Sequence, residues 1–348
     1  MQAPKDSSVT FEQLYVSTNQ STKVFLDAPN VNAPIKIALD ATGVDYFYVH
    51  CGSDALAWRA RLEQQHECDA GQQQQSIEHL ARHVAVHVLL ALQELQKRGL
   101  VHRDVKPSNI LLASPDGPTW LSDMGLAAAA CRLPGFVKGL DLAYVPPEYI
   151  VQQQQGPGNS SSSSGSRVTG GPAGGASAAG GAAGGWCILD DLPALAERTA
   201  TAADMYQLGL SIYQLLHGSL PPQLVPARGV AGNPRRLSSL LQRVATFAWQ
   251  TEIDGGIANR DAAEFLRALL CRDPALRPDP QSALQRFAWL QPVVNPALQL
   301  MERQVQAWPQ QRQEASLAAK WMELMELQQE LGHKAIEELQ QQRGQWHN

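Results

Sequence analysis

The sequence predicts an α+β fold that is mainly helical, with a small amount of β-structure near its front. Apolar residues recur at three- and four-residue steps over 76–98, which predicts a long amphipathic helix that stops at Gly99. Two short apolar runs around a Ser-Pro-Asp-Gly turn predict a β-hairpin between residues 110 and 121. Further strands are expected over 35–39 and 46–50.

The composition has enough apolar residues for a buried core, and it lacks the excess of basic residues that is typical of nucleic-acid binding. The 348 residues are 44% apolar, carry a net charge of −5 at pH 7 and have a pI near 6.0. There is no run of 18 apolar residues, so no membrane span is expected. The five cysteines show no Cys-x-x-Cys spacing, so we expect reduced thiols and no zinc.

The stretch between the predicted helix and hairpin carries the clearest chemical signal. Residues 102–109 read His-Arg-Asp-Val-Lys-Pro-Ser-Asn, and an Asp-Met-Gly triplet begins at Asp123, just after the hairpin. This fits the pattern H-R-D-x-x-x-x-N, in which the Asp accepts the proton of an attacking hydroxyl and the Asn holds magnesium. We therefore expect Asp104 as a base, with Asn109 and Asp123 as Mg²⁺ ligands, at a site that transfers the γ-phosphate of ATP.

The spacing of these residues suits phosphoryl transfer for a physical reason. The reaction leaves little covalent chemistry to the protein, so catalysis depends on fixing carboxylate, amide and metal around the γ-phosphate. A helix that delivers the loop, followed by a hairpin that ends at Asp123, would fix them. For the eight residues taken alone, an ordinary solvated turn is the alternative explanation.

With these motifs the chain resembles the eukaryotic-type protein kinase superfamily from about Tyr46 to Leu290. The resemblance also rests on Tyr-Val-Pro-Pro-Glu ending at Glu148, on Asp-Met-Tyr-Gln-Leu-Gly beginning at Asp204, and on Arg-Asp-Pro-Ala-Leu-Arg-Pro around Arg277. It implies a mainly helical large lobe and a β-rich small lobe. It also implies a buried ion pair between Glu148 and Arg277, and hydrogen bonds from Asp204 to the backbone of the catalytic loop.

Lys106, two places after the expected base, resembles the lysine of the serine/threonine branch, which contacts the γ-phosphate during transfer. The resemblance implies a protein substrate, ATP and Mg²⁺ as cofactors, and structural roles for His102 and Arg103. The segment 123–148 contains no Ser or Thr, so we expect no activating phosphorylation there. Asp141 lies where serine/threonine kinases usually have a Thr, three residues before Tyr144. It is expected to replace this Thr by pairing with Lys106.

A narrower resemblance is to chloroplast thylakoid state-transition kinases. It rests on Leu-Asp-x-x-Tyr within 140–148, on the low-complexity insertion that follows, and on Asp-Gly-Gly at 254–256. It implies a chloroplast location, with the cytoplasm as the default otherwise. The residues Met1 to Asp6 lack signal-peptide features, and the sequence leaves the compartment open.

The front of the chain departs from the kinase pattern. No G-x-G-x-x-G precedes the loop, and Lys36 lies too close to Asp104 in sequence to be the nucleotide lysine. We expect residues 1–50 to be a remnant of the small lobe that lacks its first three strands. This leaves a serine/threonine kinase with an incomplete sequence, a pseudokinase or scaffold that binds partners without catalysis, and a weak nucleotide binder with residual transfer activity.

The expected large lobe covers residues 51–290. A low-complexity stretch over 152–185 interrupts it and should be disordered, because Gln, Ser, Gly and Ala bury too little apolar surface. Residues 291–348 are expected to form a helical tail, since apolar residues recur at helical spacing over 314–343. The tail either docks a partner protein, packs on the large lobe or stays exposed.

Overall fold

The structure is a computed structural model, and its residues divide into a larger and a smaller unit. The larger unit holds residues 28–31 and 51–301, and the smaller holds residues 1–27, 32–50 and 302–348. The residues that the structure describes are 30–32, 36–39, 44–47, 51–64, 69–124, 128–129, 141–152, 185–188, 197–303, 306–307, 310 and 313.

The described part of the smaller unit centres on one antiparallel hairpin. Strands β2 (Lys36–Leu39) and β3 (Val44–Phe47) pair from Lys36 opposite Phe47 to Leu39 opposite Val44. The first strand agrees with the prediction to within one residue. The second begins two residues before the predicted start at Tyr46, because Val44 already pairs with Leu39. The assignment of residues 1–50 to a small-lobe remnant stays a prediction.

The long amphipathic helix is present as α3 (Ala70–Lys97) in the larger unit. It begins six residues before the predicted position because the Asp69 carboxylate accepts the Gln72 N–H at 2.7 Å and caps the helix. Gly99, with φ of +66°, ends it as predicted. The apolar face that the periodicity predicted is fully buried and comprises Ile77, Leu80, Ala81, Val84, Val88, Leu92 and Leu95.

The predicted hairpin is also present. Strands β6 (Ile110–Leu112) and β7 (Thr119–Ser122) pair antiparallel, with Leu111 opposite Trp120. They belong to a four-stranded sheet in the order β1-β7-β6-β4, with β1 (Val31–Asn32) and β4 (Ser53–Asp54) at the edges. The Leu121 N–H donates to the Asn30 carbonyl at 2.7 Å, which ties the front of the chain to β7.

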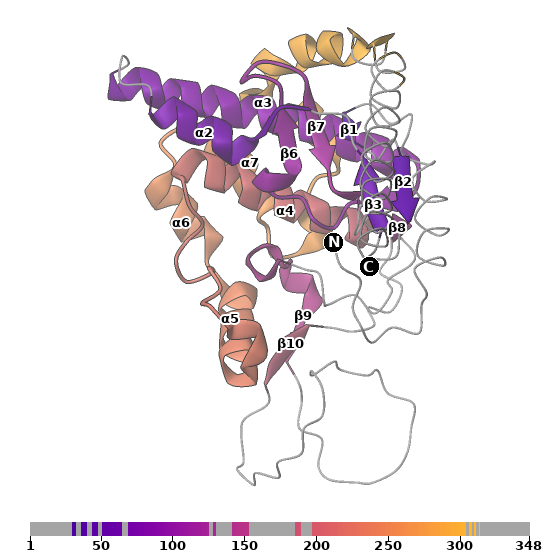
Figure 1. The fold of residues 1–348 in the computed structure, drawn as a ribbon. Coiled ribbons are helices and arrows are strands. Elements are labelled where there is room, and N and C mark those ends of the chain that lie inside the picture. Colours follow the sequence, from indigo (N-terminus) through magenta and orange to yellow (C-terminus); the bar gives the residue numbers. More distant parts are fainter. Residues whose placement is uncertain are drawn as a thin grey trace, which may run out of the picture. The chain divides into compact units, whose positions relative to one another are not determined.

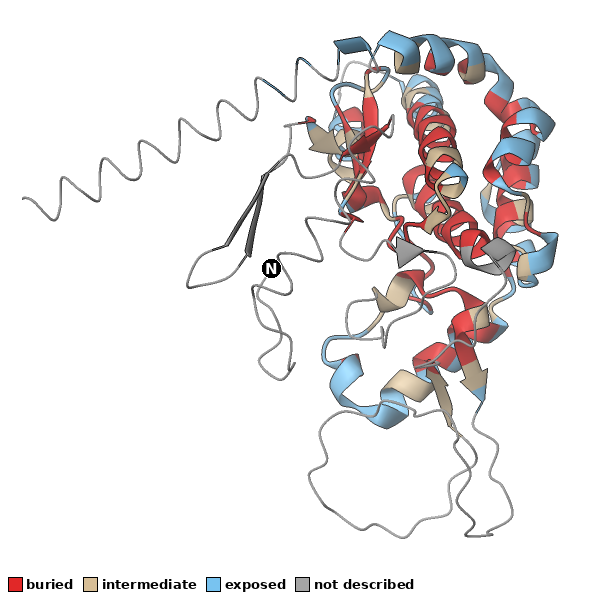
Figure 2. Ribbon diagram, turned by 90° about the vertical axis from the view of Figure 1, so that its right-hand side faces the viewer, coloured by how far each residue is buried: buried red, intermediate tan, exposed pale blue. Residues whose placement is uncertain are grey.

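Helices make up most of the larger unit, as the fold class predicts (Figure 1). Figure 2 shows buried residues concentrated where these helices pack together. Within the described residues, no helix is both long and apolar enough to cross a membrane. The longer helices are α2 (Ala55–Glu63), α4 (Glu197–His217), α5 (Pro234–Thr246), α6 (Trp249–Gly256), α7 (Arg260–Leu269) and α8 (Pro280–Arg286).

Short elements connect these helices and strands. Residues 291–303 are helical, and 314–343 lies outside the described residues, so the helical tail over 291–348 stays a prediction. The 3₁₀ turns are η1 (Pro107–Asn109), η4 (Leu142–Tyr144), η5 (Pro147–Tyr149), η6 (Val230–Gly232), η7 (Pro274–Leu276) and η8 (Ala288–Leu290). The remaining strands form two pairs, β5 (Leu100–Val101) with β8 (Ala128–Ala129) and β9 (Ile150–Gln152) with β10 (Trp186–Ile188).

The β9–β10 pair brings together the two ends of the low-complexity insertion. Gln152 lies opposite Trp186, and the Trp186 N–H donates to Ser238 Oγ on α5 at 2.8 Å. The predicted disorder of 152–185 falls almost entirely on residues 153–184, which lie outside the described residues. The insertion therefore joins two strands that could be connected by a short turn.

Replacing residues 153–184 with a turn of about four residues is expected to leave the fold intact. Closing a shorter loop costs less entropy, so the free energy of unfolding should rise by up to about 2 kcal/mol. Urea unfolding of the replaced and original chains measures the difference. A decrease of more than about 1 kcal/mol would show instead that the insertion packs against the fold.

A buried pair of histidines lies on α3. The His83 and His87 rings are 4.3 Å apart, and His83 Nε2 contacts the Gly117 carbonyl and Thr119 Oγ1. Among the described residues neither ring nitrogen of His87 has a hydrogen-bond partner, although the residue is only 1% exposed. Burial, and secondarily the neighbouring His83, holds the pKa of His87 well below its ordinary value.

His87→Leu is expected to stabilise the protein more in acid than in base. The unfolded chain binds a proton at this histidine below pH 6.5, and the folded chain does not, so folding is penalised as the pH falls. The variant removes this penalty and should gain about 1.4 kcal/mol more stability at about pH 5.5 than at about pH 8. Urea unfolding at both pH values tests this. His79→Leu, at an exposed position of the same helix that contacts Asp116, is the control, and an equal gain in acid in both variants contradicts the prediction.

Candidate active site

Helix α4 holds the backbone of the predicted catalytic loop. The Asp204 carboxylate accepts the N–H groups of His102 and Arg103 at 2.8 and 2.6 Å. Burial raises the pKa of Asp204 to about 6, while these two hydrogen bonds act in the opposite direction. Arg103 has φ of +70°, a conformation that non-glycine residues rarely adopt and that often occurs at functional sites. The bonds to Asp204 hold the loop in this shape.

Two further α4 side chains that the sequence analysis missed bind the same loop. The Val105 N–H donates to Gln207 Oε1 at 3.0 Å, and Gln207 Nε2 donates to the Arg103 carbonyl at 2.9 Å. Ser211 Oγ donates to the Val105 carbonyl at 3.2 Å. The three α4 residues that hold the loop are three and four positions apart, so they lie on one helix face. The spacing of Gln207 and Ser211 after Asp204 could have predicted that they face the same loop.

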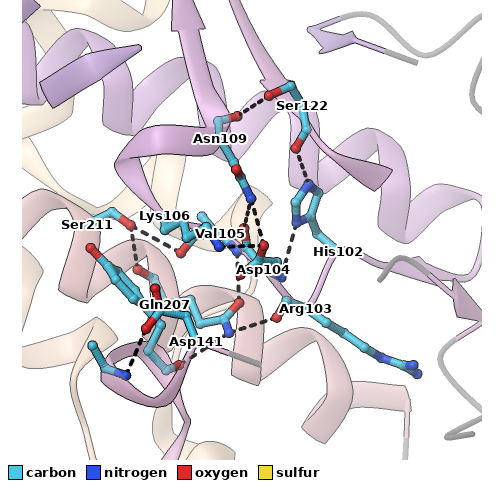
Figure 3. A network of polar contacts seen from close by, with 12 residues as sticks. His102, Arg103, Asp104, Val105, Lys106, Asn109, Ser122, Asp141, Gln207 and Ser211 are labelled. Atoms are coloured by element: carbon cyan, nitrogen blue, oxygen red, sulfur yellow. Dashed lines mark hydrogen bonds and ion pairs between the residues drawn. The ribbon is translucent and has the colours of Figure 1, made fainter. Parts of the chain in front are cut away.

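The predicted base is buried and held by two of the other predicted residues (Figure 3). Asp104 is 4% exposed, and its Oδ2 lies 2.8 Å from Asn109 Nδ2 and 2.9 Å from Lys106 Nζ. Asn109 Nδ2 also donates to the Asp104 carbonyl at 2.9 Å. Because the amide nitrogen of Asn109 faces Asp104, its amide oxygen is the atom that would bind a cation.

His102 links the loop to the strand that ends at Asp123. Its Nδ1 accepts the Asp104 N–H at 3.2 Å, so Nε2 carries the proton and donates to the Ser122 carbonyl at 3.0 Å. Burial lowers the pKa of His102 to about 4, and the carboxylates of Asp104 and Asp123 act against this shift. Ser122 Oγ also donates to the Asn109 carbonyl at 2.9 Å. One network thus joins the loop to the residue before Asp123.

Asp123 itself is exposed and has φ of +63°. The next residue, Met124, is buried, so the chain turns sharply between a solvent-facing carboxylate and an apolar contact. The Gly125 of the Asp-Met-Gly triplet lies outside the described residues, as do most of the residues that follow it up to 140. The predicted lack of activating phosphorylation in this segment stays a prediction.

The expected pair between Asp141 and Lys106 is wrong. In the described part of the chain the ion pair of Lys106 is with Asp104. Asp141 Oδ1 instead accepts the Ala143 N–H at 3.1 Å and caps the turn η4 (Figure 3). The local cap prevails because the acceptor reaches a backbone donor only two residues away, without ordering a long lysine side chain.

The ion pair that the kinase resemblance implies is formed. Arg277 Nη1 and Nη2 donate to the two carboxylate oxygens of Glu148 at 2.7 and 2.8 Å, a bidentate geometry. The exposed fractions of the two side chains are 0% and 8%. Arg277 also donates to the carbonyls of Ala202 and Cys271, and its guanidinium lies 4.8 Å from the ring centre of Tyr206.

The donor set suits a hard cation with a phosphate ligand. Mg²⁺ prefers oxygen ligands and is commonly held by one or two carboxylates together with substrate phosphates. Asn109 and Asp123 supply an amide oxygen and a carboxylate on the two sides of one hydrogen-bonded network. Within the described residues there is no group of three or more His, Cys, Asp or Glu that could hold a metal by itself.

Part of the chain matches a known protein domain. Residues 58–164 match the protein kinase domain. The kinase-domain match contains the whole loop 102–109, the hairpin β6–β7 and Asp123, as well as Glu148. The helical α+β architecture of the described residues is consistent with a kinase fold.

Named relatives with this domain are distant. The chain is 28% identical over 220 residues to calcium/calmodulin-dependent protein kinase type 1B of Rattus norvegicus, covering 60% of this chain and 46% of that protein. It is 46% identical over 67 residues to serine/threonine-protein kinase PknL of Mycobacterium tuberculosis, covering 18% and 16%. It is 39% identical over 69 residues to calcium/calmodulin-dependent protein kinase type 1 of Macrobrachium nipponense, covering 17% and 20%. The chain thus spans less than half the length of these relatives.

Proposed function

We propose that the chain is a serine/threonine protein kinase that transfers the γ-phosphate of ATP to hydroxyl groups of a protein substrate. The observation that carries the proposal is the buried Asp104 carboxylate, held by Asn109 at 2.8 Å and by Lys106 at 2.9 Å. A carboxylate fixed in this way is positioned to accept a proton at one place, as a general base must. The distant serine/threonine kinase relatives support the same class.

In this proposal the polar residues of the site have separate roles. Asp104 orients the substrate hydroxyl and takes its proton, and Lys106 contacts the γ-phosphate. Asn109 and Asp123 hold Mg²⁺, which when bound neutralises charge that develops on the phosphate oxygens. Asp204 and His102 hold the loop against α4 and β7, so that the base keeps its orientation.

The alternative is a pseudokinase or scaffold that binds partners without catalysis. It is favoured by the sequence ahead of the loop, which contains no G-x-G-x-x-G, and by the position of Lys36 in β2. In the family such a loop and lysine bind the phosphates of the nucleotide. The predicted tail over 291–348 would then serve as a partner-binding segment.

A narrower place among chloroplast thylakoid state-transition kinases is part of the proposal. It is supported by the Leu-Asp-x-x-Tyr spacing within 140–148 and by Asp-Gly-Gly at 254–256. In the described structure the Asp of this motif, Asp141, caps the turn η4. A chloroplast location follows only from this narrower placement.

Transfer from [γ-³²P]ATP to a mixture of protein substrates tests the proposed function. The complete chain with Mg²⁺ should label serine and threonine, and chelation of Mg²⁺ should abolish labelling. Asp116→Asn, at the turn of the β6–β7 hairpin away from the loop, should label like the original chain. Binding of Mg²⁺ and ATP without transfer would favour the pseudokinase, and labelling of tyrosine alone would contradict the proposed substrate class.

A further inference from the structure

Gln207 on α4 contacts two segments that are about 40 residues apart and that both belong to the candidate site (Figure 3). Its Nε2 donates to the Arg103 carbonyl of the catalytic loop at 2.9 Å and to the Tyr144 carbonyl at 3.2 Å. Its Oε1 accepts the Val105 N–H at 3.0 Å. The residue is 2% exposed, so water does not compete for these contacts.

We infer that Gln207 is a positioning residue that couples the segment 141–145 to the catalytic loop, an inference that rests on the proposed kinase function. In the sequence analysis, Asp141 is the residue expected to link this segment to the loop, by pairing with Lys106 in place of a Thr. Asp141 instead caps η4, and the ion pair of Lys106 is with Asp104. Gln207 supplies the link through hydrogen bonds to the backbone of both segments.

The side-chain orientation of Gln207 follows from its partners. The reverse orientation would place the amide NH₂ against the Val105 N–H and the amide oxygen against two carbonyls. One neutral side chain therefore satisfies one donor and two acceptors of fixed backbone. Each of these groups is costly to leave without a partner when it is buried.

Both segments also contact α4 without Gln207, so a loss of coupling can be distinguished from a loss of the fold. Tyr144 is also attached to α4 through its hydroxyl, which donates to Gln214. Val105 is also attached to α4 through its carbonyl, which accepts from Ser211 at 3.2 Å. Loss of Gln207 would thus leave both segments on the helix but remove their common contact. We expect the two segments to shift relative to each other while the fold is kept.

Hydrogen–deuterium exchange of the complete chain tests the coupling without requiring activity. Gln207→Leu should lower the exchange protection of residues 101–106 and of 141–145 by about tenfold, while residues 208–216 keep theirs. Ser211→Ala is the matched control, because the Ser211 hydroxyl contacts the loop and the Gln207 carbonyl of its own helix but not 141–145: protection should fall over 101–106 and not over 141–145. If Gln207→Leu leaves 141–145 as protected as in the original chain, the inference is overturned.

Gln207→Glu adds a readout that a purely structural residue would not move. A protonated Glu has the shape of Gln, with one oxygen to accept from Val105 and one O–H to donate to a carbonyl. Its burial raises its pKa, and above that pKa the carboxylate faces two carbonyls and the coupling is lost. Protection over 141–145 should therefore return towards the original value as the pH is lowered, and not in Gln207→Leu at the same pH. Protection over 141–145 that falls as the pH is lowered, in a folded Gln207→Glu chain, contradicts the inference.

Activity then separates the inference from the proposed function. If the original chain transfers phosphate, Gln207→Leu should lower kcat/KM for the protein substrate about tenfold and leave KM for ATP within about twofold of its original value. An equal loss of both would indicate general damage and contradict the coupling. If the original chain transfers none, the proposed function fails, and the exchange experiment still decides whether Gln207 couples the two segments.

Discussion

Arg277→Ala is expected to lower the free energy of unfolding by about 3–5 kcal/mol. The substitution leaves the Glu148 carboxylate, which is 8% exposed, without the two hydrogen bonds that Arg277 makes to it. It also removes donors from the carbonyls of Ala202 and Cys271. A buried charge that loses its partner costs far more than the net contribution of the pair, which explains the size of the effect.

Urea unfolding of Arg277→Ala, Glu148→Ala and the double variant measures this pair as a cycle. The double variant should be less destabilised than the sum of the two single variants, because it leaves no unpaired charge. Arg267→Ala is the matched control: its pair with Asp254 is exposed to solvent, so its loss should be far smaller than that of Arg277→Ala. Equal losses in Arg277→Ala and Arg267→Ala would contradict the buried-pair explanation.

Asp104→Asn is expected to lower kcat for phosphate transfer by about 10²- to 10⁴-fold, the contribution typical of a general base. The variant keeps the shape of the side chain, and its amide oxygen can still accept from Asn109 Nδ2 and Lys106 Nζ. It can no longer accept the proton of the substrate hydroxyl. The loss should therefore appear in kcat, with KM for ATP and the unfolding midpoint little changed.

Single-turnover labelling of Asp104→Asn and of the original chain measures this loss. Asp116→Asn makes the same chemical change at an exposed turn and should retain full transfer. A variant at Asp104 that transfers phosphate at the original rate would show that another group accepts the proton. A large loss of stability in Asp104→Asn would show that the carboxylate is required for folding.

Periodicity and motif spacing predicted the elements that frame the site. The face of α3 from Ile77 to Leu95 and the β6–β7 hairpin follow from local patterns, since the apolar residues at helical spacing are buried and the two apolar runs around the turn pair as strands. The pair of Glu148 and Arg277 was predictable only through the family resemblance, because the two residues are 129 positions apart.

Other features depend on contacts that sequence patterns do not show. Gln207 is neutral and binds backbone atoms more than 60 residues away, so no charge or local motif marks it. From the sequence alone, Asp141 could either pair with Lys106 or cap a local turn. In the structure its carboxylate accepts the Ala143 N–H, and the ion pair of Lys106 is with Asp104. The early start of α3 depends on the Asp69 cap, which outweighs the lack of apolar residues in that turn.

Affinity cleavage with Fe²⁺ in place of Mg²⁺ tests most directly whether the loop and the end of β7 surround one nucleotide-bound metal. Iron bound at the metal site generates radicals that cut the nearby backbone when peroxide and ascorbate are added. In the presence of ATP, we predict cuts within 102–109 and also within 122–124, and competition by excess Mg²⁺ at both places. Cuts at one segment without the other, or at neither, would contradict the shared site.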